Sequence, residues 1–169
     1  MKYYAVGLPV GCLNGGSERY FMREGLLLNI DAAAFALWIR FLHGADFENA
    51  LIGAAVSRNL GHEQAAELFD KLVKAELLVT EQDILNHVPQ RQGYGLGLSM
   101  KEKKCYVDLN GKIEVSYPAY LLWAYCDGKK NCREIIKSMP AEITDIYTDA
   151  NLFRVLGELL KENLIVFAE

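Results

Sequence analysis

The sequence predicts an α+β protein made of two similar units, each a small antiparallel β-sheet with three helices. Three observations support this fold class. Apolar motifs recur about 85 residues apart along the chain, strand-forming residues flank a turn signal ahead of each motif, and apolar residues then follow helical spacing. The composition, 51% hydrophobic and 24% charged over 169 residues, is typical of a chain that folds around a core.

The recurrence is clearest in two pairs of segments. Residues 34–38 (AFALW) align with residues 119–123 (AYLLW) at an offset of 85. Residues 72–79 (LVKAELLV) align with residues 159–166 (LLKENLIV) at an offset of 87. Because loops tolerate insertions, the change of offset indicates about two extra residues between the helices of the second copy.

A glycine-rich stretch is predicted to separate the copies. Every second residue from Gly93 to Gly97 is a glycine. A glycine-rich phosphate loop requires a following helix whose first amides face the phosphate, whereas strand-forming residues follow here. We therefore interpret residues 90–98 as a flexible linker between a first unit, residues 1–89, and a second unit, residues 99–169.

Each unit is expected to contain a β-hairpin. In the second unit two strand-forming stretches flank Asn110–Gly111, a dipeptide that favours the positive φ angles of a tight turn. In the first unit Glu24–Gly25 separates residues 20–22 from residues 26–30 in the same way. The hairpin supplies the small antiparallel sheet of each unit.

Three helices are predicted after each hairpin. The first begins at a capping residue, Asp31 or Ser116, and carries an apolar stripe that contains Trp38 or Trp123. Because both units carry a tryptophan at the same place, we interpret the two indoles as core residues and not as ligand-stacking platforms. The remaining predictions are second helices at residues 46–58 and 131–138, third helices at 62–76 and 149–163, and closing strands at 77–80 and 164–167.

No catalytic or metal centre is recognisable. The four cysteines lack paired Cys-x-x-Cys spacing, and no serine or cysteine has a recognisable histidine and acid partner. We interpret the cysteines as small buried side chains, with Cys12 a candidate for an exposed thiol. The longest apolar run, residues 32–39, is far shorter than the roughly 20 residues of a membrane span, and the N-terminus lacks a secretion-signal pattern. We expect a cytoplasmic protein that is not an enzyme and has no cofactor, metal or membrane segment.

Three helices beside a small sheet are typical of winged-helix folds, whose third helix commonly enters the DNA major groove. The charges argue against DNA as the partner. The predicted third helices carry two basic against four acidic residues at 62–76, and two against three at 149–163. With a net charge of −4, the chain has no basic stripe to release counterions from nucleic acid.

The second unit resembles the PqqD-like family of peptide chaperones, whose members also serve as recognition elements for ribosomally made peptides that undergo modification. The resemblance is carried by residues 119–123 (AYLLW), 125–128 (YCDG), 133–136 (REII) and 159–165 (LLKENLI). The first unit keeps the tryptophan-containing helix and the closing helix of this pattern. The resemblance implies a winged-helix-like unit whose function is to bind a peptide.

In that family a leader peptide adds as an extra strand to the sheet and packs on the third helix, which is β-augmentation. Carried over to the second unit, the implied site comprises the edge strand Lys112, Ile113, Glu114, Val115 and Ser116 with Leu152, Val155 and Leu159 of the facing helix. The corresponding surface of the first unit is residues 26–30 with residues 65–72.

We therefore expect a non-catalytic peptide- or protein-binding module, and presentation of a peptide to a modifying enzyme is the role that the resemblance implies. Two alternatives come from other classes of protein. One is a winged-helix DNA-binding transcriptional regulator. The other is a structural subunit whose units pack on each other or form a homodimer.

Overall fold

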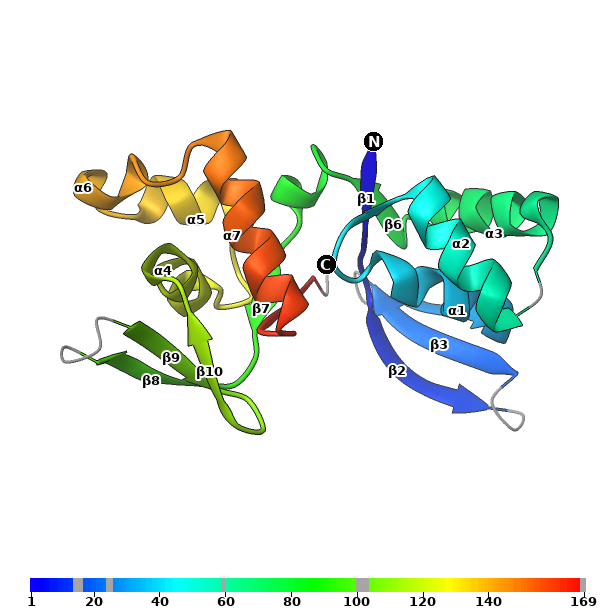
Figure 1. Ribbon diagram of the computed structural model, residues 1–169, viewed down its shortest axis with the longest axis horizontal. Helices are drawn as coiled ribbons and strands as arrows, with labels where there is room; N and C mark the ends of the chain where they lie inside the picture. The colour runs from blue at the N-terminus through cyan, green and yellow to red at the C-terminus, as the bar shows by residue number, and fades with distance from the viewer. Residues whose placement is uncertain (14–16, 24–25, 59, 100–103, 168–169) are drawn as a thin grey trace. The chain divides into compact units, whose positions relative to one another are not determined.

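The computed structural model describes residues 1–13, 17–23, 26–58, 60–99 and 104–167 (Figure 1). Within them the chain forms seven α-helices and several small antiparallel sheets, so it is a mixed α+β protein, as the sequence predicts. Contacts divide it into two compact units, Met1–Ile84 with the C-terminal residues from Phe167, and Leu85–Val166. None of the described helices is long and apolar enough to cross a membrane.

The first unit contains two three-stranded sheets. One has the order β2–β3–β4 and consists of β2 (Leu8–Leu13), β3 (Glu18–Arg23) and β4 (Leu26–Asp31). The other has the order β5–β1–β6 and consists of β1 (Lys2–Ala5), β5 (Ala45–Asp46) and β6 (Leu78–Thr80). The helices of this unit lie above the sheet β2–β3–β4 in Figure 1.

These helices are α1 (Ala32–Trp38), α2 (Phe47–Arg58) and α3 (His62–Lys74). Helix α1 begins at Asp31, whose carboxylate accepts the N–H of Ala34 at 2.7 Å, so the predicted cap is present. The core between sheet and helices includes Phe21, Leu37 and Phe41, which are completely buried. Phe21 reaches this core because it lies on the inner face of β3.

The second unit has a sheet of order β10–β9–β8, formed by β8 (Tyr94–Ser99), β9 (Lys104–Asp108) and β10 (Lys112–Val115). A separate pair joins β7 (Pro89–Arg91) to β11 (Ile165–Phe167). The helices are α4 (Tyr117–Tyr125), α5 (Cys132–Ser138), α6 (Ala141–Thr144) and α7 (Asp149–Lys161). Helix α6 was not among the three helices predicted for this unit. Pro140 occupies the N-cap position of α6, and its carbonyl accepts the N–H of Ile143 at 2.9 Å.

The predicted linker, residues 90–98, is part of the second unit in the structure, where β7 and β8 occupy most of it. Two of its three glycines lie close to neighbouring groups. Gly93 has φ +81°, and a Cβ there would lie 2.5 Å from the carbonyl oxygen of Asp108. A Cβ on Gly95 would lie 2.7 Å from the hydroxyl oxygen of Tyr120. Close approach therefore favours glycine at these two positions, whereas at Gly97, where no atom lies within 4 Å of a Cβ, the φ of +84° favours it.

In the first unit, one buried tryptophan joins the two ends of the fold. The indole N–H of Trp38 donates to the carbonyls of Val6 and Leu77, at 3.1 Å each. The N–H of Val6 also donates to the carbonyl of Leu77, at 3.0 Å. The indole thus joins the chain after β1 to the chain after α3.

The second unit contains a corresponding set of bonds. The indole N–H of Trp123 donates to the carbonyl of Gln92 at 2.9 Å, and the N–H of Gln92 donates to the carbonyl of Leu164 at 2.8 Å. Gln92 follows β7, and Leu164 follows α7. Both tryptophans are core residues, as predicted, with 3% and 4% of their surfaces exposed.

Replacing Trp38 with alanine is expected to lower the free energy of unfolding of the first unit by about 3 to 5 kcal/mol, because a large core aromatic is lost. The carbonyl of Val6 also loses a donor in this variant. Urea denaturation, followed by the NMR signals of the first unit, measures the loss. Replacing the neighbouring exposed Ile39 with alanine is the control and should cost less than about 1 kcal/mol. A Trp38→Ala protein as stable as the wild type would contradict the prediction.

Candidate functional site

The second unit presents β10 as an edge strand. It pairs with β9 on one side, and no other described strand pairs with it. At the end of β10 the N–H of Ser116 points away from β9 and donates to Glu158 on α7. Because the direction of main-chain groups alternates along a strand, those of Lys112 and Glu114 also face the open side.

Glu158 closes one end of this edge. Its carboxylate accepts the N–H of Ser116 at 2.6 Å and the hydroxyl of Ser116 at 2.8 Å. The guanidinium of Arg154 lies 3.7 Å from the same carboxylate, one helical turn away. Ser116 is also the cap of α4, so a single carboxylate connects the end of β10, the start of α4 and the body of α7.

Three predicted site residues are core residues instead. Leu152, Val155 and Leu159 are exposed by only 2%, 0% and 0%, so they cannot line an open groove beside β10. Their spacing marks the apolar face of α7, and that face turns into the unit. Of the five predicted strand residues, Lys112 and Glu114 are exposed, Ile113 and Ser116 are half-buried, and Val115 is buried.

The charged side chains of β10 contact their own sheet. The ammonium of Lys104 lies 2.8 Å from the carboxylate of Glu114. The ammonium of Lys112 lies 3.7 Å from the centre of the Tyr106 ring, a cation–π contact. The outer face of this sheet thus carries charges that are matched within the sheet.

The first unit also presents an edge strand, β4, which pairs with β3 and with no other described strand. The N–H of Ala32, just after β4, donates to the carbonyl of Ser17 on the β3 side. By alternation, the main-chain groups of Leu27, Asn29 and Asp31 face the open side. This edge is two residues longer than β10, which has four residues where β4 has six.

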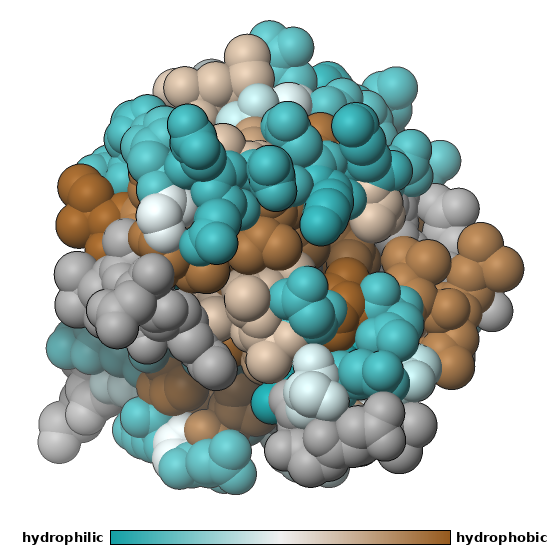
Figure 2. Space-filling view, turned by 90° about the vertical axis from the view of Figure 1, so that its right-hand side faces the viewer, coloured by the Kyte–Doolittle hydropathy of each residue, from teal (hydrophilic) through white to brown (hydrophobic). Residues whose placement is uncertain are grey.

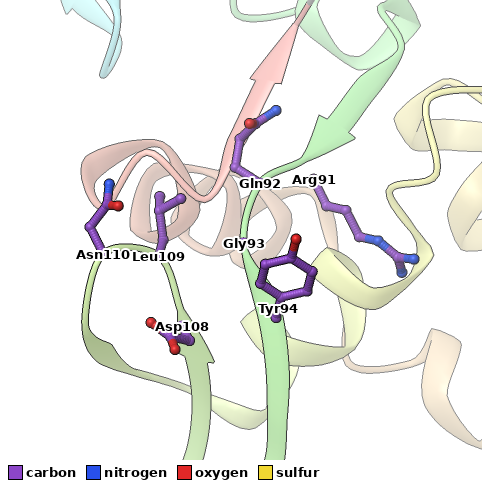
Figure 3. Close-up of a pocket in the computed structure, with 7 residues that line it drawn as sticks. All are labelled: Arg91, Gln92, Gly93, Tyr94, Asp108, Leu109 and Asn110. Atoms are coloured by element: carbon purple, nitrogen blue, oxygen red, sulfur yellow. The ribbon is translucent and has the colours of Figure 1, made fainter.

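A pocket of about 360 Å³ lies beside the sheet of the second unit (Figure 3). It is lined by Arg91, Gln92, Gly93, Tyr94, Asp108, Leu109 and Asn110. The guanidinium of Arg91 donates to the carbonyl of Ala124 at 2.7 Å, and Figure 3 shows this side chain directed away from Asp108. The lining residues include no cysteine, serine, histidine or lysine.

The four thiols divide into one exposed and three buried groups. Cys12 is exposed on β2, whereas Cys105, Cys126 and Cys132 are buried. Burial raises the pKa of Cys132 to about 12 and raises the pKa of Cys126 well above its usual value. The buried thiols are therefore protonated and weakly nucleophilic at neutral pH. Among the described residues, no three metal-ligating side chains gather into a cluster.

Comparisons with known proteins give no family for the chain. No protein-family model matches it, and no curated protein matches it in sequence. Within the described residues the outer strands of the sheets β2–β3–β4 and β10–β9–β8, which are β2, β4, β8 and β10, each pair along one side only. Of these, β4 and β10 are the edges that correspond to the predicted binding surfaces. Sequence reasoning missed Glu158, since it is one of many acidic residues on helix faces and nothing in its spacing distinguishes it.

Replacing Glu158 with alanine is expected to lower the stability of the second unit by about 1 to 3 kcal/mol, because two hydrogen bonds to a half-buried carboxylate are lost. Hydrogen exchange of the amides of β10 and α4 measures this loss. Arg154→Ala is the control. It removes an exposed ion-pair partner of Glu158 and the exposed bonds that the Arg154 guanidinium donates to Asn151, and it should cost at most about 1 kcal/mol. Equal effects of the two substitutions would show that Glu158 does not hold the strand end.

In the native protein one thiol, Cys12, is expected to react rapidly with Ellman's reagent at pH 8. The other three should react only after unfolding, because burial excludes the reagent and raises their thiol pKa values. Counting fast and slow thiols before and after adding urea tests this, with Cys12→Ser as the control. More than one fast thiol in the native protein would contradict the burial of this set.

Proposed function

We propose that the chain is a non-catalytic module that binds an extended peptide or protein segment by adding it as a strand to an open sheet edge. The observation that supports this function most directly is that β4 and β10 each pair along one side only within the described residues. An exposed edge offers a row of main-chain donors and acceptors, which is the basis of β-augmentation. We place this activity in the cytoplasm, where the bound segment is presented to a modifying enzyme.

Of the two edges, we propose β4 as the principal binding strand. Leu26 and Leu27 are 64% and 58% exposed, so apolar side chains accompany the open main chain. At β10 the end of the edge is closed by the contact between Ser116 and Glu158, and the predicted helix groove is filled by core residues. β10 remains a second edge, since Lys112 and Glu114 are exposed there.

We further propose that the two units are tandem copies of one winged-helix-like unit related to PqqD-like peptide chaperones. Several local features support a duplication. Besides the two buried indoles, the second residue after α3 and the second residue after α7 both have φ +54°, at Glu76 and at Asn163. The next residue then donates back to the helix, Leu77 to the carbonyl of Leu72 at 2.9 Å and Leu164 to that of Leu159 at 2.8 Å.

Replacing Asn29 with proline is expected to weaken peptide binding at least about tenfold, because the main-chain N–H that faces the open side of β4 is removed. Pairing of β4 with β3 does not use this N–H, so the fold should persist. The measurement is the affinity for peptides selected from a displayed random library on the wild-type chain. NMR spectra verify that each variant is folded.

Asn29→Ala is the matched control, since it shortens the side chain and keeps the N–H. Glu114→Pro makes the same backbone change at β10. Peptides that lose affinity for Glu114→Pro and not for Asn29→Pro would move the principal site to β10. Peptides that bind both proline variants as tightly as the wild type would refute strand addition.

A further inference from the structure

The outer face of the sheet β2–β3–β4 changes character along its strands. At one end Leu8, Met22 and Leu27 are direct cross-strand neighbours, and they are 40%, 39% and 58% exposed. They form a continuous apolar row that ends at the open edge. Figure 2 shows hydrophobic residues exposed among hydrophilic ones on the face of the molecule that it draws. Contiguous exposed apolar side chains mark contact surfaces more often than single ones do.

At the other end of the same face the side chains are acidic. Glu18 lies directly opposite Asp31 in the register of β3 and β4. Like charges in this position repel each other. Between the two ends Tyr20 lies opposite Asn29, and its hydroxyl donates to Glu18 at 3.0 Å. From Leu27 through Asn29 to Asp31, the open edge therefore presents an apolar, a polar and an acidic side chain in turn.

The sheet of the second unit does not share this change from apolar to acidic side chains along its outer face. There the outer-face charges are matched within the sheet, by the ion pair of Lys104 with Glu114 and by Lys112 on the Tyr106 ring. Lysine on an edge strand also protects it from further pairing. β4, with the sequence LLLNID, carries no lysine and no basic residue of any kind.

We infer that the segment that binds β4 carries a basic, a polar and an apolar residue at alternate positions, in that order along its chain. This inference rests on the proposed strand addition at β4. Every pair in this sheet is antiparallel, so an added strand that continues the pattern runs opposite to β4. Its basic residue then lies beside Asp31, its polar residue beside Asn29 and its apolar residue beside Leu27, at the ~5 Å spacing of cross-strand neighbours.

The two intervening residues of the bound segment face inward. They lie beside Ile30 and Leu28, which are half-buried on the inner face of β4, so both should be apolar. A second copy of β4 does not satisfy this requirement, because it brings another acidic residue and no cation. The charge at the end of the edge therefore favours a partner segment with a basic residue over self-association.

The test uses two peptides with glycine–serine flanks, lysine–valine–threonine–valine–leucine and the same peptide with glutamate in place of lysine. Titration calorimetry at low salt should give about tenfold tighter binding of the lysine peptide than of the glutamate peptide to the wild-type chain. The acidic end of β4 attracts the lysine and repels the glutamate. In the double variant Glu18→Gln, Asp31→Asn the two peptides should bind equally. Both amides keep the existing acceptors for Tyr20 and for the cap of α1 while removing the charge.

The outcomes separate this inference from the proposed function. Equal binding of both peptides, abolished by Asn29→Pro, would refute the charge rule and leave strand addition supported. Binding that Asn29→Pro does not reduce would refute strand addition at β4. Tighter binding of the reversed peptide, leucine–valine–threonine–valine–lysine, would refute the antiparallel order. No binding of any of these peptides, or a dimer of the chain that Asn29→Pro dissociates, would overturn the inference itself.

Discussion

A buried indole N–H needs a hydrogen-bond acceptor, and in both units the acceptor is a main-chain carbonyl on a segment remote in sequence. Trp38 reaches Val6 and Leu77, and Trp123 reaches Gln92. Each bond holds the chain that enters the sheet against the helix that covers it. The strands that follow these segments, β2 and β8, are the outer strands on one side of their sheets, and the last strands, β4 and β10, are the outer strands on the other side. The contacts that close the cores thus also anchor the segment that leads into each sheet.

Local chemistry was sufficient to predict several elements from the sequence. The caps at Asp31 and Ser116 follow from short side chains that can accept the orphan N–H groups of a helix start, and the structure contains both. The third helices were predictable because their apolar residues follow the helical period over 13 residues. The failures concern tertiary contact. In a sequence, Gly95 is compatible with flexibility and with close packing equally well, and only the position of Tyr120 shows that it serves packing.

The predicted binding site illustrates the same limit. A helical period shows that Leu152, Val155 and Leu159 share an apolar face, but it does not show whether that face is covered, and the structure covers it. Conversely, the exposed row on the first sheet depends on register, since Leu8, Met22 and Leu27 come from three strands and adjoin only after these pair. The edge strands themselves could be predicted from the sequence, because the hairpin predicts them. The difference between the side chains around β4 and those around β10 could not be predicted.

Two open edges on one chain have a consequence for binding strength. If strands add at β4 and β10 as proposed, a partner that carries two compatible segments, joined by a linker of suitable length, would engage both edges of the same molecule. Its second segment then binds at an effective concentration in the millimolar range, set by that linker and not by the amount of partner in solution. Weak individual strands would in this way give a long-lived complex, and a partner with a single segment would exchange rapidly. Two partners with identical binding sequences would then differ in the lifetime of their complexes if one carries two segments and the other carries one.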